Sequence, residues 1–178
     1  MKVILDLVIE MRRALVWVVL MMAANAQAAE GTTERLAGSF GDWSKICSSE
    51  GGEEVCHISQ SVDQNDSQGR LFQTSIGYLA GSSSPVVFLT APLGMYLPRG
   101  ITIELSESTL LSVAVQRCDV NGCLAVTTID SAFLRELQNT IEGKIVFGSN
   151  AEQNIAIPLS LNGFAEGLAS ITPAEAAN

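Results

Sequence analysis

Short apolar runs separated by turn residues recur along most of this chain, and they restrict the fold more than any other feature of the sequence. Such runs occupy residues 40–47, 54–62, 71–79, 86–90, 101–105, 110–118, 123–129, 144–147 and 154–159. Gly, Ser, Asn and Pro separate them, and strands of this length and spacing are typical of β-sandwiches and β-barrels. We therefore predict an antiparallel all-β domain.

Two of the runs alternate clearly between apolar and other residues. Ile155, Ile157 and Leu159 share one face of the last run, and Leu111, Val113 and Val115 share one face of an earlier one. Successive side chains of a strand point to opposite faces of the sheet. One face of each strand is therefore expected to contribute to the core.

Two short segments have helical spacing. Asp130 or Ser131 can cap a helix whose apolar positions are Phe133, Leu134, Leu137 and Ile141 and which ends at Gly143. A second helix is expected after Asn162, where Phe164, Leu168 and Ile171 share a face.

The four cysteines are Cys47, Cys56, Cys118 and Cys123, an even number that indicates two disulfides in an exported chain. Three pairings are possible. Pairing of sequence neighbours is favoured because each couple brackets a turn-rich stretch, 48–52 in one and Asn121-Gly122 in the other. Asn-Gly tolerates the positive φ values of a type I′ turn, so this second couple is expected to clasp a hairpin.

A zinc site and a reactive dithiol are the alternative uses of these cysteines. His57 adjoins Cys56, but spacings of nine and five residues differ from the short spacings of zinc knuckles. Reactive dithiols usually form a C-x-x-C motif at a helix N-terminus, which is absent here. We predict no metal and no cofactor.

The N-terminal residues have the organisation of a secretory signal. Arg12-Arg13 precedes an apolar stretch over residues 14–24, and Ala26-Gln27-Ala28 provides a small-x-small cleavage site. The uncharged run is shorter than the about 20 residues that a membrane-spanning helix needs. Asp6 and Glu10 are unusual in such a signal, so translation starting at Met11 is an alternative to Met1.

This organisation divides the chain into four parts. We predict a signal peptide over residues 1–28, a flexible leader over 29–38, the folded domain over 39–171 and a disordered tail over 172–178. The exported protein is expected to have no transmembrane span once the signal is cleaved.

The charge of the chain is strongly acidic, with a formal net charge of −9. Nucleic acid is an unsuitable ligand because binding to phosphates relies on clustered Lys and Arg. The acidic surface favours solubility, and it also suits cationic partners.

The usual catalytic constellations are missing from the sequence. A hydrolytic triad needs a base, and the single histidine, His57, lies beside a cysteine expected to be oxidised. We expect it to be a surface or edge-strand residue. Glu53 and Glu54 are adjacent, so on a strand their side chains point apart. The glycine-rich stretches lack the Lys-Ser or Lys-Thr of a phosphate-binding loop.

Two segments could either pack in the core or bind a partner. Trp43 enters the first run and is expected to pack in the core rather than to serve as a ligand platform. The apolar segment 91–100 contains two prolines, so it cannot be a central strand. It either folds back over the core or presents a contact surface to a partner, whose candidate residues are Met95, Tyr96, Leu97 and Arg99.

Five elements occur in a fixed order along the chain. They are Phe40-Gly41-Asp42-Trp43 with Cys47, Val55-Cys56, Pro92-Leu93-Gly94 to Leu97-Pro98-x-Gly100, Cys118-x-x-x-Gly122-Cys123-x-Ala125, and Ile157-Pro158-Leu159-Ser160-Leu161-x-Gly163-Phe164. Together they resemble the invasion-associated locus B proteins of alphaproteobacteria. The resemblance covers residues 38–171.

The resemblance implies a secreted or envelope-located domain of immunoglobulin-like β-sandwich type with a link to host-cell invasion. It also supports a bridge between Cys47 and Cys56 and another between Cys118 and Cys123. It brings no catalytic residues. The acidic charge departs from basic members of the family, which would suit a different surface partner.

The leading hypothesis is thus a non-catalytic periplasmic or secreted protein that acts by contact with a protein or an envelope component, with association to the outer membrane as a further option. An envelope enzyme acting on thiols or glycans and a small-ligand carrier are the alternatives. The sequence leaves the partner and the oligomeric state open.

Overall fold

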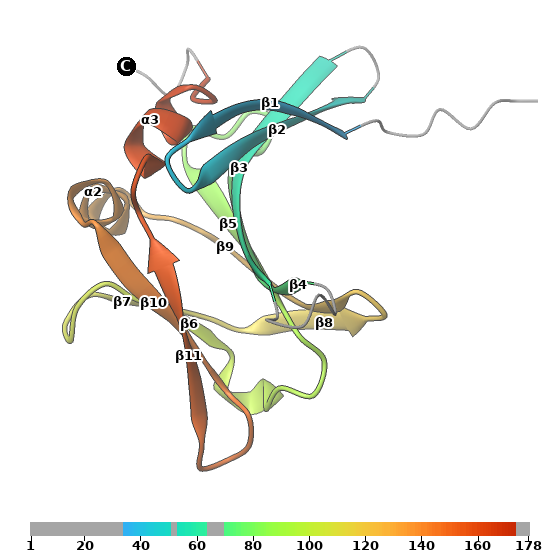
Figure 1. The fold of residues 1–178 in the computed structure, drawn as a ribbon, viewed down its shortest axis with the longest axis vertical. Coiled ribbons are helices and arrows are strands. Elements are labelled where there is room, and N and C mark those ends of the chain that lie inside the picture. Colours follow the sequence, from blue (N-terminus) through green and yellow to red (C-terminus); the bar gives the residue numbers. More distant parts are fainter. Residues whose placement is uncertain (1–33, 51–52, 64–69, 174–178) are drawn as a thin grey trace, which may run out of the picture. The chain divides into compact units, whose positions relative to one another are not determined.

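The computed structural model describes residues 34–50, 53–63 and 70–173, which form two antiparallel sheets (Figure 1). The larger sheet has seven strands, in the spatial order β1 (Glu34–Phe40), β2 (Trp43–Glu50), β3 (Glu53–Asp63), β4 (Arg70–Tyr78), β5 (Pro85–Ala91), β9 (Gly122–Thr128) and β8 (Val115–Asp119). The smaller sheet has four, in the order β11 (Asn154–Ser160), β10 (Glu142–Gly148), β6 (Ile101–Glu104) and β7 (Leu110–Val113).

The two sheets face each other across a single apolar core (Figure 1). Its central side chains are Ile58, Ile76, Val87 and Leu89 from the larger sheet and Ile103, Ile145, Phe147, Ile157 and Leu159 from the smaller one. The rings of Phe72 and Phe147 stack across the interface with centroids 5.9 Å apart. This confirms the predicted β-sandwich, in which the inner faces of two sheets interdigitate.

One predicted strand is divided between the sheets. The run 110–118 forms β7 and β8, which are separated by Ala114. Val113 pairs with Ile101 of the smaller sheet, whereas Val115 pairs with Ala125 of the larger one. The chain therefore changes sheets at this residue, which an unbroken alternation of apolar residues could not reveal.

The first strand lies in the region predicted to be a leader. β1 begins at Glu34, so the expectation of a flexible leader over 29–38 is wrong for residues 34–38. Most of this edge strand is exposed and it has no apolar periodicity. Its order comes from backbone pairing with β2, from Glu34 opposite Ser48 to Phe40 opposite Trp43.

Both predicted helices are present and cover one end of the core beside the smaller sheet (Figure 1). Helix α2 (Ser131–Asn139) begins where predicted, because the Asp130 carboxylate accepts a hydrogen bond from the Phe133 amide at 2.8 Å. The expected end at Gly143 is wrong. Ile141 is 79% exposed, and the residues from Glu142 onward form β10 because they pair with β11.

The second helix, α3, spans Phe164–Ala169, and Phe164 and Leu168 are buried on it as predicted. Thr172 donates a side-chain hydrogen bond to the Leu168 carbonyl at 2.9 Å, so the first residue of the predicted tail is tied to this helix. The predicted signal, with Met1 and Met11, lies outside the described residues, as do residues 29–33 and 174–178.

No helix in the described part of the chain is long and apolar enough to cross a membrane.

Candidate functional site

The turn between β1 and β2 interlocks with the connection between β11 and α3. The Asp42 amide donates to the Asn162 carbonyl at 3.1 Å. A Cβ on Gly41 would lie 2.5 Å from that same carbonyl oxygen, and a Cβ on Gly163 would lie 2.1 Å from the Phe40 carbonyl oxygen. Both glycines also have positive φ, of 53° and 79°, a conformation that side chains disfavour. The two segments therefore approach closely only because both positions are glycine.

Side chains extend this junction into the core. The Trp43 indole nitrogen donates to the Ser160 carbonyl at 3.0 Å, and its ring meets that of Phe164 edge-on with centroids 5.2 Å apart. Gln60 donates to the same carbonyl at 3.1 Å, and the Ser160 hydroxyl donates to the Asp42 carboxylate at 2.6 Å. Trp43 is only 1% exposed, so it packs in the core as predicted.

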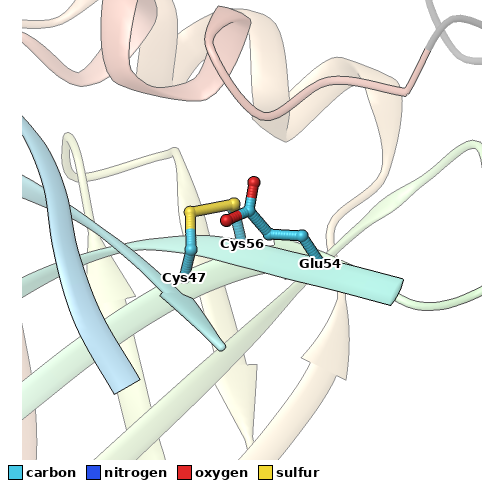
Figure 2. A group of neighbouring side chains, drawn as sticks. All are labelled: Cys47, Glu54 and Cys56. Carbon is cyan, nitrogen blue, oxygen red and sulfur yellow. A yellow bond between two sulfur atoms is a disulfide. The ribbon is translucent and has the colours of Figure 1, made fainter. Parts of the chain in front are cut away.

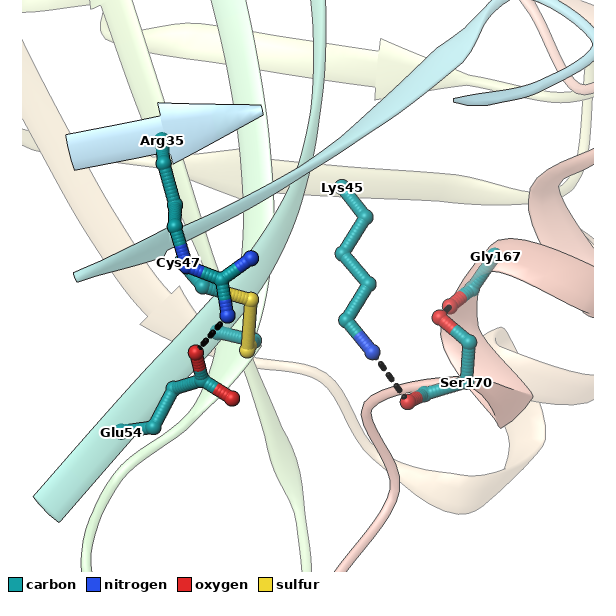
Figure 3. Close-up of a disulfide and its surroundings, with 7 residues drawn as sticks. Arg35, Lys45, Cys47, Glu54, Gly167 and Ser170 are labelled. Carbon is teal, nitrogen blue, oxygen red and sulfur yellow. Dashed lines mark hydrogen bonds and ion pairs between the residues drawn. A yellow bond between two sulfur atoms is a disulfide. The ribbon is translucent and has the colours of Figure 1, made fainter. Parts of the chain in front are cut away.

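The first disulfide joins Cys47 of β2 to Cys56 of β3, directly opposite each other in register. Arg35 pairs with Glu54 beside it, and the Lys45 ammonium donates to the Ser170 carbonyl after α3 at 2.8 Å (Figure 3). Cys47 is 1% exposed. The disulfide thus links the two strands of the β2–β3 hairpin, and the Arg35–Glu54 and Lys45–Ser170 contacts lie beside it.

Glu54 lies next to the two sulfurs, with one potential ligand atom from each of the three residues within 4.8 Å of the others (Figure 2). A thiolate is the form of cysteine that ligates a metal, and both sulfurs are bonded to each other. As long as the disulfide is intact, this cluster is not a metal-binding site.

The second disulfide joins Cys118 to Cys123 across the β8–β9 hairpin. The hairpin was predicted, but its two loop residues are Val120 and Asn121, and Gly122 opens β9 opposite Asp119. The Asp119 carboxylate accepts a hydrogen bond from the Asn121 amide at 2.8 Å, which fixes the turn one residue earlier than Asn-Gly alone suggests. Cys118, unlike Cys47, is exposed.

The four residues proposed to contact a partner, Met95, Tyr96, Leu97 and Arg99, differ in how deeply they are buried. Met95 is 8% exposed and belongs to the core, so it offers no contact surface. Tyr96 is half-buried and its amide donates to the Gly148 carbonyl at 2.7 Å. Leu97 and Arg99 are exposed in the 3-10 turn η2 (Leu97–Arg99), and Arg99 donates to Asn154 and to the Ala151 carbonyl.

A separate hollow lies on the face of the larger sheet that points away from the smaller one. Its volume is about 400 Å³, and it is open to solvent. The lining residues are Glu34, Val55, Cys56, His57, Gln73, Ser75, Gly77, Tyr78, Leu79, Phe88, Thr90 and Leu124. Cross-strand pairing aligns His57 with Gly77, so the hollow lies over the middle of the sheet.

His57 is the only histidine of the chain and it is half-buried here. Of the two expected positions, the edge strand is wrong because β3 is an inner strand, whereas the hollow that His57 lines is open to solvent. Burial lowers the pKa of the imidazole below its ordinary value of 6.5, and the nearby Glu34 carboxylate partly opposes this effect. The ring is therefore neutral at pH 7. In the described part of the chain it forms no hydrogen bond that would orient it as a catalytic base.

Comparison with known families identifies the chain. The model of the "Invasion associated locus B (IalB) protein" family matches residues 43–172. The chain belongs to this family.

Relatives of known name agree with this assignment. Two proteins of Brucella abortus, from strain 2308 and from biovar 1 strain 9-941, are named invasion protein B homologues, and each is 22% identical to this chain over 148 residues. The match covers 83% of this chain and 85% of each relative. The crystal structure of invasion associated protein B from Bartonella henselae has the same fold, with a TM-score of 0.66 and 22% identity over 77% of this chain and 95% of that one.

The elements that carry the resemblance to the IalB family build the scaffold in this chain. The first and last of them form the junction around Trp43 and Ser160, and the cysteine-containing ones form the two stapled hairpins. Sequence reasoning missed the hollow, because its residues come from five strands. The available signal was β5, which reads Val86-Val87-Phe88-Leu89 with no polar alternation.

Proposed function

We propose that this member of the IalB family is an exported, non-catalytic protein that acts by contact with a protein or another envelope component. The observation that supports this most directly is the structural role of the residues that carry the family resemblance. Gly41, Trp43, Ser160 and Gly163 are engaged in holding the two sheets together, and all four cysteines are bonded. Because these residues have structural roles, we infer that the protein functions through contacts made by its surface rather than through a catalytic centre.

Export is supported by the cysteines and by the N-terminal sequence. Two disulfides are stable in an oxidising compartment such as the periplasm or the exterior, and residues 1–28 have the pattern of a secretory signal. The proposed location is the periplasm or the exterior, with association to the outer membrane as a further option. The names of the relatives suggest that the contact contributes to host-cell invasion or colonisation.

Photo-cross-linking in living cells tests the contact. A photoreactive amino acid placed at exposed positions of the full-length protein should capture one discrete envelope or host-surface component, from a few neighbouring positions only. A protein found in the cytoplasmic fraction, or cross-linking that gives no discrete product from any face, would refute the proposal.

Thiol alkylation followed by mass spectrometry tests the non-catalytic part against a thiol-disulfide enzyme. All four cysteines should resist alkylation in protein taken directly from the cell. A stable population with one reduced pair that turns over a disulfide substrate would instead establish an enzyme.

A further inference from the structure

The outer face of the larger sheet is more apolar than a solvated sheet face usually is. Phe88 of β5 and Leu124 and Val126 of β9 are half-buried on this face, and Val86 of β5 is 4% exposed there. None of the four belongs to the apolar cluster between the sheets. An antiparallel sheet with one wet face usually alternates apolar and polar residues, and strands apolar on both faces are usually covered on both. The smaller sheet and both helices lie on the opposite side (Figure 1).

Exposed aliphatic side chains surround this apolar centre. Val55 is 48% exposed and Leu79 is 55% exposed at the rim of the hollow, and Leu36 on neighbouring β1 is 67% exposed. Leu36 pairs with Ile46, which in turn pairs with His57, so the apolar row continues across the sheet. Contiguous exposed apolar surface of this kind marks interaction sites.

Gly77 makes the hollow deep enough to receive a side chain. Its Cβ would lie 3.1 Å from the His57 Cβ, between that residue and Val86 in the cross-strand row. The Ser59 and Ser75 hydroxyls beside it satisfy each other at 3.0 Å, and Gln73 donates to Ser59 at 2.8 Å. The floor is therefore apolar or internally satisfied, and its volume of about 400 Å³ lies in the range of about 300–1,000 Å³ of ligand sites.

The negative charge at the hollow favours a basic partner over a second copy of this acidic chain. Among the described residues that line it, Glu34 is the only one charged at neutral pH, because His57 is neutral there. Arg117, opposite Leu124 at the far edge, is offset by Asp119 at 4.0 Å. A second copy of this chain, with a net charge of −9, would bring acid against acid. A cationic occupant is attracted both by Glu34 and by the field of the whole chain.

We propose that this outer face is the contact surface of the protein, and that it binds a segment of a partner protein that presents an apolar side chain next to lysine or arginine. The apolar side chain enters the hollow over Gly77, with Val55 and Phe88 diagonally on either side of that position, and the basic group lies beside Glu34. This inference rests on the proposed function, to which it adds the face and the chemistry of the partner.

Fluorescein-labelled synthetic peptides test the chemistry of the partner. The purified protein should bind Lys-Val-Lys-Phe-Lys-Val at least tenfold more tightly than Glu-Val-Glu-Phe-Glu-Val or Lys-Ser-Lys-Ser-Lys-Ser, as measured by fluorescence polarisation at fixed salt. Binding should perturb the His57 ring resonances. Equal affinities for the three peptides would overturn the proposal.

Matched variants test the face. Val55→Arg should weaken binding of the basic apolar peptide at least tenfold, whereas Val120→Arg, at a 91% exposed valine of the β8–β9 turn, should not. Glu34→Gln should weaken it several-fold and Glu152→Gln, in the β10–β11 loop, should leave it unchanged. All four positions are exposed, so the fold is expected to persist, and circular dichroism checks this.

Two further outcomes separate this inference from the proposed function. If Val55→Arg cross-links to the same envelope component in cells as the parent protein, at the same yield, the proposed function stands and this face is refuted. Concentration-dependent dimers in sedimentation experiments that Val55→Arg abolishes and Val120→Arg does not would show that the face binds a second copy, and would also refute the inference.

Discussion

Among single residues, His57 lies in an environment that its position next to Cys56 in the sequence did not predict. Its neighbour Cys56 points toward the other side of the sheet, because adjacent residues of a strand face opposite ways. The disulfide and the imidazole are therefore in different environments. The histidine belongs to the outer hollow and is governed by burial and by Glu34.

The titration of His57 should reflect this environment. Because the chain has one histidine, its ring resonances can be followed by NMR without ambiguity, and we expect a pKa below 6.5. Glu34→Gln removes the opposing charge and should lower the pKa further. A pKa at or above 6.5 in the parent protein would contradict the described burial.

The same shift has a defined effect on stability. Well above pH 6.5 the ring is neutral in both the folded and the unfolded state, and the contribution of His57 to stability is fully present. As the pH falls below 6.5 the unfolded chain takes up the proton first, so stability decreases until the pH passes the lower pKa of the folded state. His57→Gln should reduce this loss of melting temperature between pH 7 and pH 5.

The junction glycine Gly163 allows close approach as well as a positive φ, and Gly81 provides a control for φ alone. Gly81 has a φ of 73°, but nothing lies within 4 Å of its would-be Cβ. Gly81→Ala should cost about 1 kcal/mol through backbone strain. Gly163→Ala, with φ of 79° and a clash against Phe40, should cost at least about 2 kcal/mol more. Equal losses in urea denaturation would show that the junction is not tightly packed.

At the scale of elements, the hairpins are the best-specified units. Each disulfide links residues directly opposite in register, Cys47 to Cys56 and Cys118 to Cys123. Turn residues within a few positions of the cysteines determine both hairpins, so their pairing follows from local chemistry. Long-range information was not needed to predict them.

The two staples should differ in their contribution to stability. Chain entropy gives about 2.2 kcal/mol for the loop closed by Cys118–Cys123 and about 2.7 kcal/mol for Cys47–Cys56. Each bridge has one buried cysteine, Cys47 in the first and Cys123 in the second, both 1% exposed, so replacing either pair by serine also buries a hydroxyl. The double serine variant of the second bridge should cost at least about 2 kcal/mol, and that of the first about 0.5 kcal/mol more, because its closed loop is longer. Equal stabilities of these variants and the parent in chemical denaturation would contradict this account.

Elements were predicted less well where their neighbours decide them. β1 lacks an apolar face because it is an edge strand held by backbone hydrogen bonds, and Ile141 satisfies the helical spacing but is claimed by the strand pairing that follows. Ile155 fits the alternation of β11 yet is 41% exposed at the start of the strand. For β1 and Ile141, pairing with a neighbouring strand decided the structure against the local pattern.

For the molecule as a whole, the proposed export predicts that residues 1–28 are removed. We expect the exported protein to begin near Ala29, because Ala26-Gln27-Ala28 has the small-x-small pattern that signal peptidase recognises. N-terminal sequencing of protein from the periplasm or medium measures this directly. An N-terminus that retains Met1 or Met11 would rule out cleavage.

Local patterns in the sequence were enough to predict the all-β class, the inward-facing Ile157 and Leu159, the start of α2 and the two stapled hairpins. These depend on residue spacing, turn chemistry and neighbours a few positions away, which are present in the chain before it folds. The family resemblance was also readable, because its five elements keep their order.

Only the tertiary structure decided the pairing of β1, the change of sheet at Ala114, the junction of Gly41 with Gly163 and the hollow around Gly77. Each depends on groups brought together from remote parts of the chain, and no local pattern encodes such a meeting. The burial of Met95 and the exposure of Val55 follow from the same cause: apolar character is a property of the residue, but the side of the sheet that is covered is a property of the fold.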